Sequence, residues 1–287
     1  MKTEQSTFTV DGISVDAVLT LPDTTQELPV PAVFTGPGFA GVKEMLIPDY
    51  SRDLAERGIA SLAFDYPGFG GSAGDPRQQI DPPQQLRTFR GALDALCADS
   101  RIDNARIGVW GTSMSGGHSL VMAATDSRVK AVAAIIPFIH LTPAGNTRLL
   151  SVLARDAIRR ATGRPGLTIP VAGHPGEVAA MNSDGAYEWA EEMAKGASAY
   201  RNVVTVASLP RMLKWSTADA ANKISIPVLA ILAETDTITP PARVRKALED
   251  VPNVDYLSYP ESHFELFTVH GASVRDDTVE WLSKQLL

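Results

Sequence analysis

The sequence predicts an α/β protein built on a mostly parallel, doubly wound sheet. Apolar runs of strand length alternate with segments that carry the 3.6-residue periodicity of helices. The run 227–233 is apolar throughout, which is typical of a strand buried on both faces. Asp11-Gly12 between two β-rich runs predicts an antiparallel hairpin near the start. With 287 residues, 44% of them hydrophobic, the chain can bury a large core.

The expected elements follow from these patterns in order. After the hairpin of 7–10 and 13–21, alternating apolar and β-branched residues predict strands at 29–35, 59–65, 106–110, 129–136, 227–233 and 254–259. Helical spacing between them predicts helices at 44–57, 83–98, 114–125, 241–250 and 272–287.

One interval is far too long for a loop between two strands, residues 137–226. Within it, 147–162 carries an apolar stripe with arginines at other positions, and 184–195 and 209–215 also have helical spacing. The sequence therefore predicts a core formed by 1–136 and 227–287, and a helical cap, 137–226, inserted after the sixth strand. We expect the arginines of the cap to face water; they are Arg148, Arg155, Arg159, Arg160 and Arg164.

A serine stands at the predicted corner between strand 106–110 and helix 114–125. Such a corner exposes a nucleophilic hydroxyl, and it requires small residues two positions to either side. Around Ser113 these residues are Gly111 and Ser115. Ser115 has the same spacing between Ser113 and Gly117, but it falls in the first helical turn, so Ser113 is the favoured nucleophile. The alternative without chemistry is a serine- and glycine-rich turn.

An acid and a histidine follow the serine in the order Ser, acid, His. Asp236 comes just after strand 227–233, and His263 comes just after strand 254–259. The carboxyl ends of parallel strands meet at one edge of a sheet, where these side chains could converge on Ser113. Alone, Asp236 could cap a helix and His263 could be an ordinary loop residue. As an ordered set with the serine they predict a catalytic triad, in which Glu234 is the alternative acid.

An oxyanion hole needs a backbone N–H from the turn after strand 29–35 and the N–H that follows the nucleophile. The first turn reads Gly36-Pro37-Gly38-Phe39-Ala40-Gly41. Proline has no N–H, so Pro37 cannot donate. The expected donors are therefore the amides of Phe39 and Met114.

These residues carry a resemblance to the α/β-hydrolase superfamily, in particular to its dienelactone-hydrolase-like and acyl-peptidase-like serine esterases. The matching motifs are 36–41, Asp65-Tyr66-Pro67-Gly68-Phe69-Gly70-Gly71-Ser72, 111–118, 235–240 and 262–264. The resemblance implies an α/β-hydrolase fold with Ser113, Asp236 and His263 as nucleophile, acid and base. Two positions depart from the pattern: Pro37 stands where relatives often have histidine, and Ser115 replaces a glycine. Dienelactone hydrolases use cysteine, so the serine argues against their reaction.

The expected function is that of a serine hydrolase cleaving a carboxylic ester, or a thioester or lactone, of a small to medium apolar substrate. We expect His140, Trp189 and Trp215 of the cap to contact the substrate. The alternatives are amide or carbon–carbon bond hydrolysis by the same triad, or a binding module without catalysis. No nucleotide fingerprint or metal-ligand spacing occurs, so the sequence implies no cofactor and no metal.

The charge and composition of the whole chain narrow the classes of partner that the protein is expected to bind. A net charge of −7 without a Lys/Arg cluster argues against nucleic acid and anionic membranes. The first residues lack the apolar core of a signal peptide, which leads us to expect a cytoplasmic protein. The single cysteine, Cys97, has no partner for an internal disulfide. A small-molecule substrate is the expected partner, and a homodimer is one alternative for the oligomeric state.

Overall fold

The computed structural model describes residues 1–23, 29–141 and 147–287, and the side chains of helix α4 from residue 149 onward. Its strands are β1 (Lys2–Val10), β2 (Ile13–Leu21), β3 (Val30–Thr35), β4 (Ala60–Phe64), β5 (Ile102–Thr112), β6 (Val129–Ile135), β7 (Thr168–Ile169), β8 (Val204–Thr205), β9 (Val228–Ala233) and β10 (Val254–Tyr259). Its helices are α1 (Ile47–Glu56), α2 (Pro82–Ala98), α3 (Met114–Thr125), α4 (Thr147–Ala161), α5 (Ala186–Met193), α6 (Ser208–Leu213), α7 (Ala218–Ala221), α8 (Pro241–Ala247), α9 (Glu265–Val269) and α10 (Gly271–Leu286).

Eight of these strands form one sheet in the order β1-β2-β4-β3-β5-β6-β9-β10. The hairpin β1–β2 is antiparallel, and β2 also pairs antiparallel with β4. All the other pairs in this sheet are parallel. The carboxyl ends of β3, β5, β9 and β10 therefore share one edge, which is where the loops that carry the expected site residues begin.

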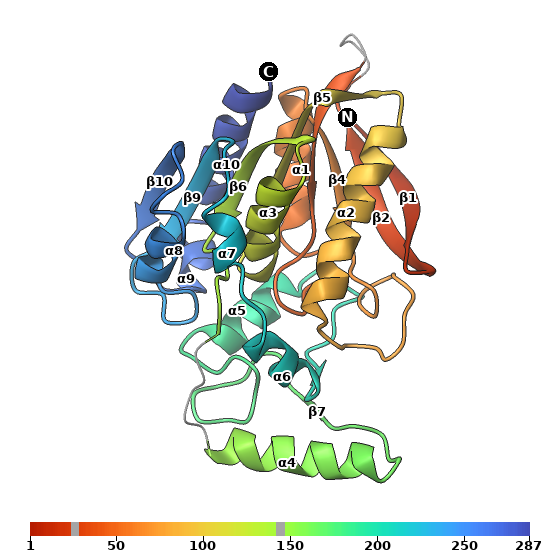
Figure 1. Ribbon diagram of the computed structural model, residues 1–287, viewed down its shortest axis with the longest axis vertical. Helices are drawn as coiled ribbons and strands as arrows, with labels where there is room; N and C mark the ends of the chain where they lie inside the picture. Colours follow the sequence, from red (N-terminus) through yellow and green to blue (C-terminus); the bar gives the residue numbers. More distant parts are fainter. Residues whose placement is uncertain (24–28, 142–146) are drawn as a thin grey trace.

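Helices lie on both faces of the large sheet (Figure 1), and the alternation of side chains along each strand divides the core into two layers. In β9, Val228, Ala230 and Leu232 pack on the side of α2, α3 and α8, whereas Leu229 and Ile231 pack on the side of α1 and α10. Helices on both faces explain why this strand is apolar throughout. The predicted α/β-hydrolase architecture with a mostly parallel, doubly wound sheet is confirmed.

Individual boundaries differ from the expected ones. The helix expected at 44–57 begins at Ile47, with Pro48 in its first turn, where the missing proline N–H costs nothing. The residues just before it belong to a loop whose Lys43 N–H is bonded to the Asp65 carboxylate. The strand expected at 106–110 extends from Ile102 to Thr112, and the short helix α9 was not predicted.

The segment between β6 and β9, residues 136–227, is called the insert below. It carries helices α4 to α7 and the two-stranded sheet β7–β8. In Figure 1, α4, α5, α6 and β7 lie together beyond one end of the large sheet, with α4 outermost. Within the described ranges, none of the helices combines the length and the apolarity that crossing a bilayer requires.

Candidate active site

Ser113 occupies a tight turn between β5 and α3. Its backbone has φ 51° and ψ −113°, a conformation that residues with a Cβ rarely adopt. Hydrogen bonds hold it there: Ser113 N donates to Ile135 O over 2.9 Å, and Ser113 O accepts from Gly117 N and Phe138 N. A Cβ at Gly111 would lie 2.5 Å from the backbone of Ser115, so only glycine fits at that position.

Ser115 is placed differently from Ser113. Its side chain is fully buried, and its hydroxyl accepts from Thr112 N and donates to Thr112 O, both over 2.9 Å. The hydroxyl thus closes the turn from inside. This arrangement explains how serine replaces the usual glycine, and it leaves Ser113 as the hydroxyl at the mouth of the turn.

Asp236 and His263 form a buried pair. His263 Nδ1 lies 2.6 Å from Asp236 Oδ2, and both residues are about 95% buried, with 5% and 4% exposure. The other oxygen, Asp236 Oδ1, accepts from the N–H groups of Ile238 and Thr239. The carboxylate therefore orients the histidine and closes its own loop at the same time. It does not cap α8, which begins after Pro240 without a side-chain cap.

The surroundings of Asp236 keep it ionised. Burial raises the pKa of the Asp236 carboxyl, but the hydrogen bond and charge of His263 and the bonds from Thr239 outweigh burial and lower it below 3.8. Thr239 Oγ1 donates to Asp236 Oδ2 over 2.7 Å and lies 3.3 Å from His263 Nδ1. Sequence reasoning missed this threonine, although its spacing of three residues from the aspartate is a signal for such a bond.

Glu234, the alternative acid, turns away from the histidine. Its side chain is 39% exposed, and Glu234 Oε1 lies 2.6 Å from Arg245 Nη2. The hydrogen bond from this guanidinium lowers the pKa of Glu234. The geometry thus favours Asp236 as the partner of His263.

The loop after β3 lies against the serine turn. A Cβ at Gly38 would be 3.5 Å from Thr112 Oγ1 and 4.0 Å from Ser113 Cβ. Among the hydrogen bonds of the described residues, the N–H groups of Phe39 and Met114 find no acceptor. Two free backbone donors beside one hydroxyl are the elements from which an oxyanion hole is built.

Two cavities meet at Ser113. The smaller has a volume of about 40 Å³ and is lined by Ser113, His263, Trp189, Phe264 and other apolar residues. The larger has a volume of about 360 Å³. Residues of the core such as Phe39, Ser113, Met114 and Arg243 line it together with residues of the insert such as Leu209 and Met212. The predicted nucleophile and histidine therefore face one cavity, and both expected oxyanion residues line the other.

Comparisons with known proteins identify a matching family model, relatives and a similar solved structure. Residues 31–270 match the family model described as alpha/beta hydrolase fold. The chain belongs to the alpha/beta hydrolase family. Among its relatives are the quorum-quenching protein AidA of Acinetobacter baumannii, 28% identical over 91% of this chain and 87% of AidA, and a thiohydrolase of Eupenicillium brefeldianum, 31% identical over 77% of this chain and 75% of that protein. A solved structure of DcsB with its substrate analogue superposes with a TM-score of 0.86 at 26% identity, covering 99% of both chains. These relatives support the prediction that the protein is an enzyme.

The three expected substrate-contacting residues have different positions. Trp189, on α5, lines the smaller cavity and packs on Phe264. Trp215 lines neither of these two cavities; its ring packs on His118, 5.7 Å between centroids. His140 is exposed, and its carbonyl accepts from Arg243 Nη1 over 2.8 Å. The local pattern could not distinguish the two tryptophans, because the folding of the insert decides which one faces the cavity.

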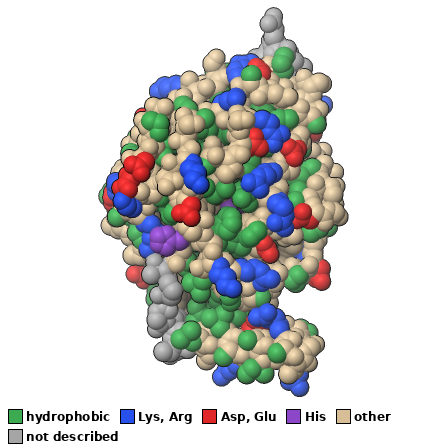
Figure 2. Space-filling model, viewed as in Figure 1, with side chains coloured by type: hydrophobic (Ala, Val, Ile, Leu, Met, Phe, Trp, Pro, Cys, Tyr) green, Lys and Arg blue, Asp and Glu red, His purple; other side chains and the backbone are tan. Residues whose placement is uncertain are grey.

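None of the described arginine side chains of α4 lines either cavity. Arg155 and Arg160 are exposed and Arg159 is half-buried, while the side chain of Arg148 lies outside the described residues. Figure 2 shows cationic and apolar side chains together on this outlying helix, and Leu150 is 60% exposed there. The arginine that does line the larger cavity is Arg243 of α8, which the sequence did not single out. Among the described residues, no cluster of three His, Cys, Asp or Glu side chains could hold a metal ion.

His118 is a buried packing residue of α3. Its Nε2 lies 3.1 Å from Gln85 Oε1, and its ring contacts Phe89 and Trp215. Burial lowers the pKa of His118 from 6.5 to about 3, so the imidazole is neutral in the folded protein at neutral and mildly acidic pH. Neutral and enclosed, it supports the helix behind Ser113 rather than the chemistry.

We predict that His118 makes the free energy of unfolding pH-dependent. Between pH 6.5 and about 3, the unfolded chain binds a proton that folded His118 does not, so stability falls with falling pH by up to about 1.4 kcal/mol per unit. His118→Gln should flatten this slope, measured by urea unfolding at pH 7 and 4.5. The matched control is His174→Gln, which removes an exposed histidine and keeps the buried imidazole of His118, so it should retain the slope that His118 produces. Equal slopes in wild type and His118→Gln would contradict the assignment.

Proposed function

We propose that this protein is a serine hydrolase that cleaves a carboxylic ester or thioester with a small to medium, mainly apolar acyl group. One observation carries the proposal: His263, which is paired with the buried Asp236, and Ser113 in its strained turn line a common cavity. The relatives include a protein named thiohydrolase, which supports the thioester as one of the substrate classes.

The mechanism follows from the positions of these groups. His263 takes the proton of Ser113 while Oγ attacks the carbonyl carbon and forms the tetrahedral intermediate. The N–H groups of Phe39 and Met114 donate to the oxyanion. Asp236 holds His263 in the tautomer with hydrogen on Nδ1 and stabilises its charged form. His263 then protonates the leaving group, and the acyl-enzyme is hydrolysed by a water that His263 activates.

The two cavities would hold different parts of the substrate. His263 must reach the leaving group to protonate it, so the leaving group belongs in the smaller cavity, which His263 and Trp189 line. The acyl group then extends into the larger cavity between the core and the insert. Its lining is mainly apolar, with Met212 and Leu209 among the insert residues, and this favours a neutral acyl chain.

We predict that Ser113 is the residue that becomes acylated. Ser113→Ala should lower kcat by about 10⁴ or more and abolish labelling by a fluorophosphonate, because the attacking oxygen is lost. Ser115→Ala is the matched control; it loses only the hydrogen bonds to Thr112 and should retain labelling. Mass spectrometry of the labelled peptide locates the adduct. A phosphonate on Ser115, or an unlabelled wild-type protein, would contradict the proposal.

We predict that the acid is Asp236. Asp236→Asn keeps an oxygen for the N–H groups of Ile238 and Thr239 but cannot hold His263 in the same tautomer, so kcat at pH 7 should fall by several orders of magnitude. Glu234→Gln removes an exposed carboxylate and should leave kcat within about twofold. A larger loss in Glu234→Gln, with the melting temperature retained, would exchange the two roles.

We predict that the larger cavity limits the length of the acyl chain that the enzyme accepts. In a series of straight-chain S-ethyl thioesters, each methylene that fits should contribute up to ~0.8 kcal/mol, a factor of about four in kcat/KM, until the cavity is full. Met212→Ala should move the maximum to a longer chain. Trp189→Ala should change the preference between leaving groups and keep the acyl maximum. A tenfold preference for acyl chains ending in a carboxylate would instead show that Arg243 binds the substrate.

A further inference from the structure

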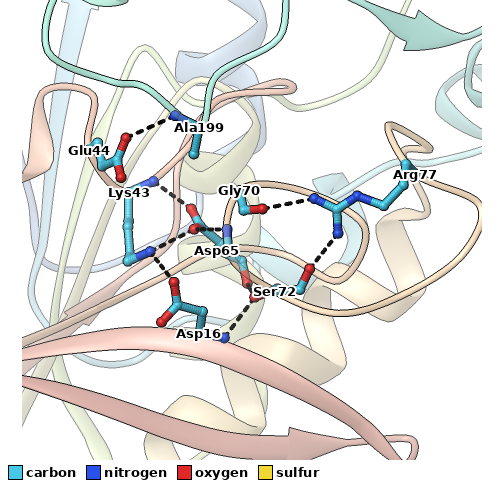
Figure 3. Close-up of polar contacts among 9 residues, drawn as sticks. Asp16, Lys43, Glu44, Asp65, Gly70, Ser72, Arg77 and Ala199 are labelled. Carbon is cyan, nitrogen blue, oxygen red and sulfur yellow. Dashed lines mark hydrogen bonds and ion pairs between the residues drawn. The ribbon is translucent and has the colours of Figure 1, made fainter.

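The loop after β3, residues 38–46, carries the Phe39 amide and has few hydrogen bonds to the body of the protein. Its backbone bonds among the described residues are internal, such as Gly41 N to Gly38 O and Met45 N to Val42 O. Its hydrogen bonds to the sheet come from Lys43. The Lys43 N–H donates to Asp65 Oδ1 over 2.7 Å, and Lys43 Nζ donates to Asp65 Oδ2 over 2.7 Å (Figure 3).

Lys43 is bound from two strands at once. Besides Asp65 at the end of β4, its ammonium donates to Asp16 Oδ2 of β2 over 2.6 Å. The Lys43 side chain is 8% exposed and that of Asp65 is fully buried. Burial lowers the pKa of Lys43, but the hydrogen bonds to Asp16 and Asp65 outweigh it and raise the pKa above 10.5. The lysine is thus a permanent cation in a buried ion-pair cluster.

A second loop is shaped to receive these carboxylates. A Cβ at Gly70 would lie 2.0 Å from Asp65 Oδ2, and a Cβ at Gly71 would lie 2.0 Å from Asp16 Oδ2. Gly71 N also donates to Asp65 Oδ2 over 2.9 Å. Ser72 Oγ donates to Asp65 O and accepts from Asp16 N. The glycine-rich stretch 68–72 therefore makes room for the carboxylates, donates one hydrogen bond to Asp65 and ties the backbones of Asp65 and Asp16 together through Ser72.

We propose that Lys43 is a positioning residue that holds the Phe39 amide in place for oxyanion stabilisation, acting through its ion pairs with Asp65 and Asp16. Three residues, 40–42, separate Phe39 from Lys43, and the turn between them includes Ala40 at φ 53°. A backbone donor stabilises an oxyanion only when it is fixed at hydrogen-bond distance before the charge develops. Adjacent Glu44 extends the same loop to the insert, where its Oε2 accepts from Ala199 N over 3.3 Å.

The inference rests on the proposed hydrolase function and predicts a particular kinetic change. Lys43→Met should lower kcat by about 10- to 100-fold and leave KM within about twofold, because the loop loses position but the cavities keep their walls. The affinity for a trifluoromethyl ketone, which becomes an oxyanion when Ser113 adds to it, should fall by the same factor as kcat/KM. Lys43→Arg, which can still bridge two carboxylates, should restore most of kcat.

Arg101 offers the matched control. It also bridges two carboxylates, Asp99 at 2.7 Å and Glu4 at 3.1 Å, but it precedes β5 at the sheet edge opposite Ser113. Arg101→Met should change the melting temperature and leave kcat and the ketone affinity unchanged. Should Lys43→Met not fold, Lys43→Gln, which keeps a shorter donor, should show an intermediate loss of kcat.

The outcomes separate this inference from the proposed function. If wild-type protein is labelled at Ser113 and a folded Lys43 variant retains full kcat and ketone affinity, the positioning role is wrong. A rise in KM at unchanged kcat, or an equal loss of kcat in Arg101→Met, overturns it as well. If wild-type protein is not labelled at Ser113, it is the proposed function that fails.

Discussion

The backbone of Ser113 is the point on which the rest of the site is built. At φ 51° this residue costs conformational energy that its neighbours must offset, and they do so through fixed contacts. Ile135 O and the N–H groups of Gly117 and Phe138 bind its two peptide groups, while Gly111 permits the close approach of the Ser115 backbone that the turn requires. A hydroxyl held in this way has one position relative to the sheet, so the loops after β3, β9 and β10 can be arranged around it.

Two buried charge clusters arrange those loops, and they differ in what they fix. Asp236 binds His263 with one oxygen and its own loop with the other, so the histidine and the carboxylate are positioned as one unit. Lys43 and Asp65 fix a backbone segment instead of a reactive side chain. Buried ion pairs contribute little net stability because desolvation offsets their attraction. What both clusters provide is a defined geometry at the edge of the sheet.

The sequence offered signals for the parts of the candidate site that depend on local order. The Ser113 turn, the acid after β9 and the histidine after β10 each follow a strand whose apolar pattern is strong, and parallel strands bring such positions to one edge. Residues whose role arises only from tertiary contact were missed. Lys43 had no local signal, because its partners Asp16 and Asp65 are 27 and 22 residues away. The local sequence around Trp215 and Trp189 did not distinguish them, and only the fold of the insert places Trp189 at the smaller cavity and Trp215 against His118.

This division explains why the motifs identify the fold family more sharply than the substrate. The candidate catalytic groups follow strands of the large sheet, where hydrogen bonds and close glycine contacts that tolerate little change hold their turns. The walls of the larger cavity come in good part from the insert, where apolar side chains such as Leu209 and Met212 can be exchanged for others of similar volume. Under the proposed function, geometry therefore constrains the chemistry, whereas cavity volume constrains the range of acyl groups. Volume leaves little trace in a local sequence pattern.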